Sequence, residues 1–295
     1  MRVTFNQLHD GIDAVNFAAA QFDRWQQQVQ TGKRVQLPSD GPDAMQRIVQ
    51  ERAELGTIDA YVRSADSAAT KLAALDTILT DVVERLTDAQ ATAASARGST
   101  VTPPQREAAA NALTGIRDAL LRDVNSTFRG TYLFSGRETA SVPYQQVAGA
   151  WTYQGDNTAV TVDVGRNRSV AVTVDGASLV QGSDATDLFT ELDTLITAVQ
   201  TGDNTGVANG MAALRRAFDR AVQTQSRLGA DQQGIADEQL QLTNLRLASL
   251  KRVSADEDAN LAEAISAMER AATAYRAALG AVGTAANQSL LDYLR

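Results

Sequence analysis

Cysteine is absent from this 295-residue sequence, and histidine occurs once, at His9. The lack of cysteine excludes disulfides, thiol catalysis and cysteine-ligated metal. A single histidine excludes a multi-histidine metal site, and a catalytic triad would have to be built around His9 itself. No HExxH motif and no nucleotide-binding glycine motif occurs. The sequence therefore predicts a protein that is not an enzyme and that holds no metal and no cofactor.

Aromatic residues and lysine are also scarce, and their scarcity limits the possible fold and partners. Aromatic residues make up 5% of the chain, and the hydrophobic share of 44% is largely alanine, which is typical of a helical protein with few bulky core residues. The net charge of −8 argues against a nucleic-acid partner. The only lysines are Lys33, Lys71 and Lys251, no run of apolar residues is long enough to span a bilayer, and the N-terminus lacks the pattern of a cleavable signal peptide. We therefore expect no membrane insertion.

Apolar residues recur at alternating spacings of four and three at both ends of the chain, which predicts two terminal helices that pair as in a coiled coil. The apolar positions are Phe5, Leu8, Ile12, Val15, Phe22 and Val29 in the first run, and Leu261, Ile265, Met268, Tyr275, Leu279 and Val282 in the last. Both runs also contain alanine, and the outward face of the first is rich in Asn and Gln and poor in charge. Helices of this kind are marginal alone, so we expect the two runs to be an assembly interface that orders when neighbouring subunits arrive. An ordinary solvated face that happens to use amides is the alternative.

A segment with two prolines and two glycines, residues 31–44, predicts a joint between the first terminal helix and the next helix. Ser39 or Asp40 is placed to cap the new helix, with Pro42 in its first turn. The joint residues are Gly32, Lys33, Arg34, Pro38, Ser39, Asp40 and Pro42.

The middle of the chain predicts a helical body with a β-rich insert. Helical spacing covers residues 43–97, 103–125, 185–200 and 207–258, with Thr102 and Gln105 placed for a capping box. Alternating β-branched residues follow from about 132 to 182, with a strand near Trp151 and a hairpin turn at 165–168. The insert is small and should lean on the bundle.

The predicted fold is mainly α with a small β insert: an elongated nested helical bundle with long coiled-coil-like terminal helices and an antiparallel β subdomain in the middle. Residues 1–38 and 260–295 form terminal arms, expected to be disordered in the monomer. Residues 39–131 and 184–259 form the helical body, and residues 132–183 form the outer insert.

Two clusters invite a functional interpretation. The acidic run Asp256-Glu257-Asp258 is interpreted as the first turn of a helix capped by Ser254, because it lacks the ligand spacing and the glycine of a cation loop. Trp151 and Tyr153 are interpreted as packing residues, and a platform for a surface glycan is the alternative.

Several stretches resemble the bacterial flagellin family. Residues 31–44 are similar to its glycine- and proline-containing joint, residues 125–136 to its "N…GxY(I/L)F(A/S)G" element, and residues 226–230 to its "R(A)xLG(A)" turn; residues 256–265 and the tail at 289–294 complete the resemblance. These stretches span nearly the whole chain in order. Thr31 and Gly41 depart from the usual serine and aspartate of the joint. The prolines of the joint and the Leu-Asp-Tyr-Leu tail favour the junction proteins of the family over its filament flagellins.

The resemblance implies a structural subunit at the hook–filament junction of the extracellular flagellum. It implies export in an unfolded state through the flagellar type III apparatus with a cytoplasmic chaperone. It also implies assembly as a ring of copies between the other hook-associated junction protein and flagellin. A short filament flagellin is the alternative within the family, and a glycan-binding module that uses the insert is the alternative outside it.

The amide-rich arms generate a first prediction. In the purified monomer, backbone amides of residues 1–30 and 262–295 should exchange with deuterium almost at once, because order in the arms depends on neighbouring subunits. Amides of the helical body provide the internal control and should be protected. Strong protection throughout both arms would contradict order on assembly.

Overall fold

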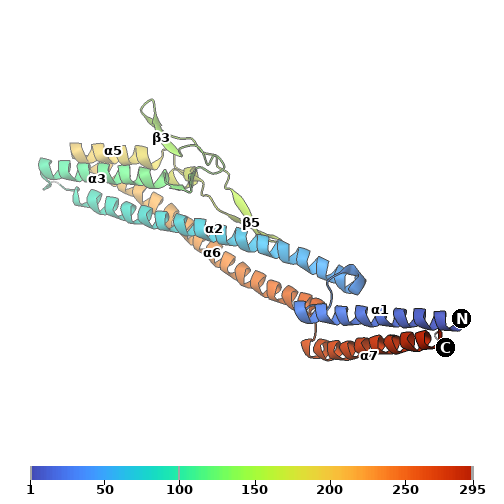
Figure 1. The fold of residues 1–295 in the computed structure, drawn as a ribbon. Coiled ribbons are helices and arrows are strands. Elements are labelled where there is room, and N and C mark those ends of the chain that lie inside the picture. Colours follow the sequence, from blue (N-terminus) through green and yellow to red (C-terminus); the bar gives the residue numbers. More distant parts are fainter. Residues whose placement is uncertain (1, 99, 294–295) are drawn as a thin grey trace. The chain divides into compact units, whose positions relative to one another are not determined.

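The computed structural model describes the backbone of residues 2–98 and 100–293 and the side chains of residues 9–98 and 100–284. The chain is mainly helical, as predicted (Figure 1). Its α-helices are α1 Arg2–Thr31, α2 Pro42–Ser95, α3 Pro103–Val124, α4 Gly176–Val180, α5 Leu188–Thr201, α6 Asn204–Glu257 and α7 Leu261–Tyr293, and a short 3₁₀ helix, η1, covers Pro38–Asp40. No helix among the described residues is long and apolar enough to cross a membrane.

The strands form small antiparallel pairs in the middle of the chain, as predicted. They are β1 Thr127–Phe128 with β2 Thr131–Tyr132, β3 Tyr144–Val147 with β4 Ala150–Tyr153, and β5 Thr161–Gly165 with β6 Arg168–Ala171. The register of β5 and β6 pairs Val162 with Val170 across the predicted hairpin turn. Two-stranded pairs are not stable alone, which is why the insert packs against helices.

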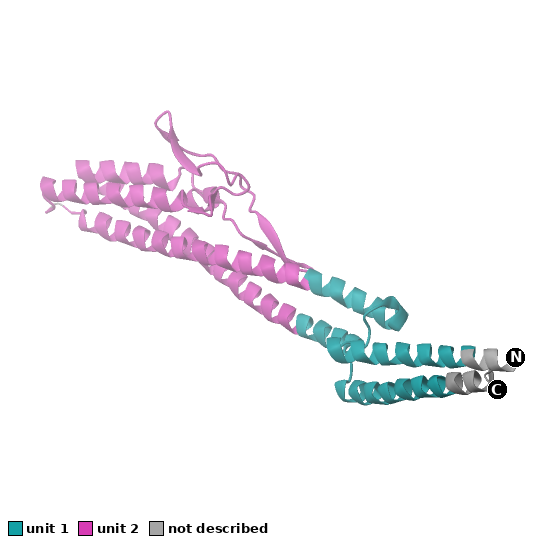
Figure 2. Ribbon diagram, viewed as in Figure 1, with its two compact units in different colours: residues 1–57, 245–295 teal, residues 58–244 magenta. Residues whose placement is uncertain are grey.

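Contacts divide the chain into two compact units (Figure 2). Unit 1 contains residues 1–57 and 245–295, and unit 2 contains residues 58–244. The boundaries fall inside α2 and α6, and the β pairs belong to the same unit as the middle helices. The division into arms, body and insert by role stays a prediction.

The core of unit 2 follows the predicted stripe of α2. Ile58 is buried and Tyr61 is half-buried, and from Ala65 to Ala93 the side chains at three- and four-residue spacings are buried. Leu72, Leu75 and Leu79 are fully enclosed. The series from Ala65 to Ala93 shares one hydrophobic cluster with the inward residues of α3, α5, α6 and the β pairs. At the start of α3, the backbone N–H of Thr102 donates to Gln105 Oε1 at 2.8 Å, as the capping-box pattern predicts.

The insert is tied to this core at the element that resembles the flagellin pattern. Leu133, Phe134 and Ser135 are fully buried, and Gly136 has a φ of +62°. A Cβ at Gly136 would lie 1.9 Å from the carbonyl oxygen of Asp156, so only glycine fits there. The carbonyl oxygen of Phe134 accepts hydrogen bonds from the Tyr153 hydroxyl and from the Gly176 N–H, both at 3.0 Å. These contacts hold segments of the insert to one another, and Leu133 and Phe134 anchor them in the helical core.

Unit 1 pairs the two terminal helices, α1 and α7, in antiparallel directions. They approach closely at Gly11, where a Cβ would lie 2.9 Å from Cγ2 of Val282. A small cluster of Val35, Ala44 and Ile48 covers the start of α2. The predicted pairing of the chain ends is thus present in the structure.

The enclosed leucines of α2 generate the second prediction. Leu79→Ala should lower the free energy of unfolding of unit 2 by about 2–5 kcal/mol, because it leaves a cavity in a close-packed core. Leu240→Ala is the matched control, since Leu240 is 65% exposed on α6 and its truncation should cost less than about 0.5 kcal/mol. Urea unfolding followed by circular dichroism measures both. Equal losses would contradict the assignment of the core.

Candidate functional site

The predicted assembly residues of the arms divide into two groups. Val15, Phe22, Val29, Met268, Tyr275 and Val282 are half-buried along the α1–α7 pair. Four others are exposed: Ile12 by 44%, Leu261 by 49%, Ile265 by 43% and Leu279 by 46%. The side chains of Phe5 and Leu8 lie outside the described residues. No finding tests the role of these residues in assembly, so that role stays a prediction.

The line of closest contact between α1 and α7 runs over smaller residues than the heptad pattern indicated. Ala264 and Ala267 are buried on α7, and Gln28 is buried on α1 with 6% exposure. Small side chains let two helices approach closely. Leu261, Ile265 and Leu279 of α7 lie to the side of this contact and stay exposed. The signal that could have found this line is the series of alanines on α7 at three- and four-residue spacings, from Ala264 to Ala278.

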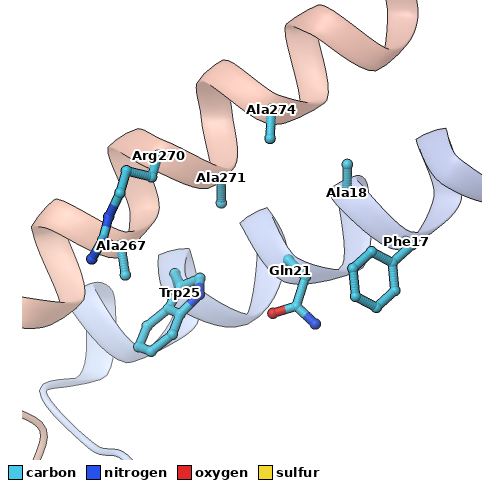
Figure 3. A pocket seen from close by; sticks show the side chains of 8 residues that line it. All are labelled: Phe17, Ala18, Gln21, Trp25, Ala267, Arg270, Ala271 and Ala274. Atoms are coloured by element: carbon cyan, nitrogen blue, oxygen red, sulfur yellow. The ribbon is translucent and has the colours of Figure 1, made fainter.

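An open groove of about 410 Å³ lies along the α1–α7 pair (Figure 3). In Figure 3, Ala271 and Ala274 point from α7 toward α1, and Ala18 points from α1 toward α7. The rings of Phe17 and Trp25 lie on α1, on either side of Gln21. Phe17 is 68% exposed. Arg270 lies on the α7 side. The groove is an apolar surface that the chain itself leaves uncovered.

The joint residues come together where α1 ends and α2 begins. Gly32 has a φ of +70°, its N–H donates to Gln28 at 2.9 Å and its carbonyl accepts from the Ala259 N–H at 2.8 Å. Pro38, Ser39 and Asp40 form η1, and Pro42 opens α2 as predicted. The expectation that Ser39 or Asp40 caps α2 is wrong, because both residues lie in η1 and Gly41 separates them from Pro42. Oδ2 of Asp40 instead accepts from the backbone N–H of Leu37 at 2.9 Å and of Gln36 at 3.0 Å. These two hydrogen bonds lower the pKa of Asp40 and hold the turn.

A set of charged side chains, which we name the clasp, fastens the joint to the end of α6. Its members are Lys33, Arg47, Arg52, Asp256 and Glu257. Glu257 has a side chain that is only 7% exposed, and it pairs with Lys33 and, at 2.7 Å, with Arg52. Arg47 pairs with Asp256 at 2.6 Å. The clasp therefore joins the segment after α1, the first turns of α2 and the last turn of α6.

Backbone hydrogen bonds run through the same point. The N–H of Arg34 donates to the carbonyl oxygen of Glu257 at 2.7 Å, and Nη2 of Arg34 donates to the carbonyl oxygen of Asp256 at 2.7 Å. Because these carbonyls belong to the last turn of α6, no N–H group within the helix donates to them. Arg34 provides the missing hydrogen-bond donors. Lys33 and Arg34 thus act on neighbouring groups of the helix end.

The expectation that residues 256–258 begin a helix is wrong. Asp256 and Glu257 end α6, and Asn260 precedes α7, its Oδ1 accepting from the Glu263 N–H at 3.4 Å. Carboxylates at a helix C-terminus are unfavourable toward the helix dipole, so they need cations from elsewhere. The sequence could not reveal this, because the compensating Lys33, Arg47 and Arg52 lie about 200 positions away.

The electrostatics of the clasp favour the ionised carboxylates. Burial raises the pKa of Glu257, but hydrogen bonds from Lys33 and Arg52 outweigh it and leave the pKa below its ordinary value. A hydrogen bond from Arg47 lowers the pKa of Asp256. Nearby, Arg252 donates to Glu51 at 2.6 Å and lowers the pKa of that carboxyl as well. The carboxyl groups of Asp256 and Glu257 are therefore ionised near neutral pH.

Trp151 and Tyr153 are packing residues, as the sequence interpretation preferred. Trp151 packs against Phe189 with ring centroids 5.4 Å apart, and its indole N–H donates to Asp193 at 2.8 Å. The hydroxyl of Tyr153 is bonded inward, and burial raises its pKa to about 12. Both side chains use their polar atoms within unit 2, so no observation favours a glycan platform.

His9 is exposed on α1. Within the described ranges, no group of three or more histidine, aspartate or glutamate side chains is arranged to hold a metal ion. The candidate functional site therefore lies in unit 1. It consists of the two terminal helices, the groove along them and the ion pairs of the clasp.

Comparisons with known proteins agree on one group. The profile of the bacterial flagellin N-terminal helical region matches residues 9–139. Flagellar hook-associated protein 3 of Salmonella typhimurium is 29% identical over 232 residues, which cover 72% of each chain. The protein of the same name from Escherichia coli is 26% identical over 214 residues, covering 68% of this chain and 67% of that one.

Solved structures show the same fold. A putative flagellar hook-associated protein from Vibrio parahaemolyticus superposes with a TM-score of 0.71 at 18% identity, over 74% of this chain and 99% of the other. The flagellar junction protein FlgL from Legionella pneumophila superposes with a TM-score of 0.62 at 13% identity, over 72% and 99%.

The clasp generates the third prediction. Glu257→Gln should lower the free energy of unfolding of unit 1 by about 1–3 kcal/mol at neutral pH, because it weakens charged hydrogen bonds at a buried site. In the parent chain, Glu257 has a lower pKa folded than unfolded, so its contribution is present above pH of about 4.5 and is lost as the pH falls through the folded value. The variant should therefore show a smaller loss of stability between neutral and acid pH.

The two tryptophans allow each unit to be followed separately. Trp25 lies on α1 in unit 1 and Trp151 lies in unit 2, so fluorotryptophan labels give one ¹⁹F NMR signal for each. Urea titrations at several pH values then measure the Trp25 signal. Glu269→Gln, at an exposed position of α7, is the matched control and should shift the transition by less than about 0.5 kcal/mol. An unchanged pH dependence in Glu257→Gln would refute the role of the clasp.

Proposed function

We propose, from its match to the bacterial flagellin N-terminal helical region and its similarity to flagellar hook-associated protein 3, that this chain is a structural subunit of the bacterial flagellum, at the junction between hook and filament. The observation that carries the proposal is the match to the Salmonella protein across 72% of both chains. The family pattern at the N-terminal region includes most of α1, the joint and α2.

The subunit acts by packing and carries out no reaction. Its working parts are the paired arms, which leave bulky apolar side chains on their surface, and the clasp, which fastens the arms to α2 and α6. A mechanical adaptor needs such a fastening, because load applied to an arm must reach the rest of the chain. The arms and the joint named above are the proposed assembly interface.

The proposed partners follow from the junction role. They are further copies of the chain in a ring, the other hook-associated junction protein on the hook side and flagellin on the filament side. The chain reaches this extracellular site unfolded through the flagellar type III apparatus, with a cytoplasmic chaperone. A sequence without cysteine supports this route, because no disulfide can form before export.

A short filament flagellin is the second candidate, and the match to the flagellin N-terminal region favours it. Polymerisation separates the two functions. A flagellin forms long filaments from purified monomer on added seeds, whereas a junction subunit does not.

The assembly role generates the fourth prediction. Deletion of residues 1–30 or of residues 265–295 should leave unit 2 folded, because its core contains no residue of either arm. Cells that carry either deletion should assemble no normal filaments and should not swim. Circular dichroism and the Trp151 signal confirm folding, and electron microscopy counts filaments. Normal filaments on swimming cells would rule out the proposed function.

A further inference from the structure

The α2–α6 pair continues into unit 1 with little burial. The structure describes residues 49–57 of α2 and 245–256 of α6 in full, and among them Ser249 is the one buried residue. Three leucines of α6 in this stretch stay exposed: Leu245 by 45%, Leu247 by 52% and Leu250 by 41%. Val49 of α2 is exposed by 55%. Apolar side chains grouped at a surface mark an interaction site, whereas single ones are ordinary.

One side of this stretch is polar. It holds a cleft of about 290 Å³ lined by Arg47, Gln50 and Glu51 of α2 and by Arg252, Ala255 and Asp256 of α6. Glu51 pairs with Arg252 at 2.6 Å, and Asp256 pairs with Arg47 at 2.6 Å. The charged groups on this side therefore have partners within the chain.

The opposite side of the same stretch is apolar. At about 100° per residue, its residues lie roughly 140–160° around α2 from Glu51 and around α6 from Ala255, so they face away from the cleft. We name these five residues the bare face: Val49, Ala53 and Gly56 of α2, and Leu250 and Val253 of α6. Four of them are exposed, and Val253 is half-buried.

The members of the bare face share one span of the pair. The ion pair between Glu51 and Arg252 sets these two residues level, and the helices run in opposite directions, so position 53 of α2 is level with position 250 of α6. The α6 members therefore fall within the span of about 10 Å that the α2 members cover. A Cβ at Gly56 would meet nothing within 4 Å, so the surface there is open.

The charges beside the bare face are positive at the surface. Arg52 lies about 60° from Val49 around α2 and has a side chain that is 52% exposed, whereas its partner Glu257 is 7% exposed. Arg246 lies about 40° from Leu250 around α6 and is exposed. The whole chain carries a net charge of −8, so this positive rim is a local feature. A partner complementary to the bare face is apolar at its centre and acidic at its edges.

We propose that the bare face binds one amphipathic helix of another protein, whose apolar residues recur at spacings of three and four and whose flanks carry carboxylates. Two helices side by side offer an elongated apolar surface that suits a third helix. Unit 2 has this arrangement within the chain, because α3 and α5 share one hydrophobic cluster with α2 and α6 there. The inference goes beyond the proposed function, because it concerns a surface outside the arms and a partner that is not another copy.

Binding of a designed peptide to the purified whole chain tests the proposal. The probe is a fluorescein-labelled peptide of three heptads, with leucine at positions a and d and glutamate at e and g, whose like charges oppose pairing with itself. A second peptide carries lysine at e and g and is otherwise identical. At low ionic strength, fluorescence anisotropy should give an affinity at least about tenfold higher for the glutamate peptide, because its charges oppose those of the rim. The net charge of the chain by itself favours the lysine peptide.

Val49→Thr and Leu250→Gln test the location of the site. Each replaces an apolar side chain with a polar one of similar size, and each should weaken binding of the glutamate peptide by at least about fivefold. Leu240→Gln is the matched control, since Leu240 is 65% exposed on the same helix outside this stretch, and it should change the affinity by less than about twofold. Arg246→Gln should reduce the preference for glutamate over lysine. Circular dichroism confirms that each variant is folded.

Equal affinities for the two peptides, or tighter binding of the lysine peptide, would show that the rim does not select an acidic partner, and the proposal would be wrong. It is equally wrong if Val49→Thr and Leu250→Gln leave the affinity unchanged. If the free chain self-associates and Leu250→Gln abolishes that association, a second copy occupies the bare face and the proposal is overturned. None of these outcomes bears on the junction role, which the arm deletions test.

Discussion

Close packing of the two terminal helices over small side chains is the constraint on which unit 1 depends. Alanine at 264 and 267 and glycine at 11 let α1 and α7 approach, and this approach decides which side chains remain for other contacts. If leucine occupied the contact positions between α1 and α7, the large apolar side chains would be buried and the exposed surface of the pair would be polar. Here the closure uses the small residues, and Leu261, Ile265 and Leu279 stay at the surface. The apolar surface of the arms is thus a result of how the pair closes.

Much of the fold was predictable because helical periodicity is a local signal. The stripe from Ala65 to Ala93 is buried as its spacing indicates. The cap at Thr102 precedes α3, and Pro42 lies in the first turn of α2, as predicted. The hairpin turn after Gly165 was also visible, since strand alternation and turn residues are local too. The extent of the sheet was not, because pairing between strands depends on contacts that the alternation does not encode.

The candidate site was predictable in part. The joint and the paired arms follow from composition and spacing, but the line of contact between α1 and α7 does not, because a heptad pattern of large residues obscured the alanine series beside it. The clasp was missed for a different reason. Acidic residues are more favourable at the start of a helix than at its end. Only the folded structure shows that ion pairs with Lys33, Arg47 and Arg52 stabilise these carboxylates at the end of α6. The difference lies in interactions between residues far apart in sequence, which a local pattern does not contain.

The sequence separation within the clasp has a consequence for the order in which the chain folds. Its hydrogen bonds join residues 205 and 209 positions apart, from Arg52 to Glu257 and from Arg47 to Asp256. A contact of this length forms only after most of the chain is available, and it closes a very large loop. A chain that emerges from a narrow channel with its N-terminus first therefore has an open joint until residue 257 has emerged. In a chain delivered in that direction, the clasp can close only once α6 is complete, and the pairing of α1 with α7 follows it.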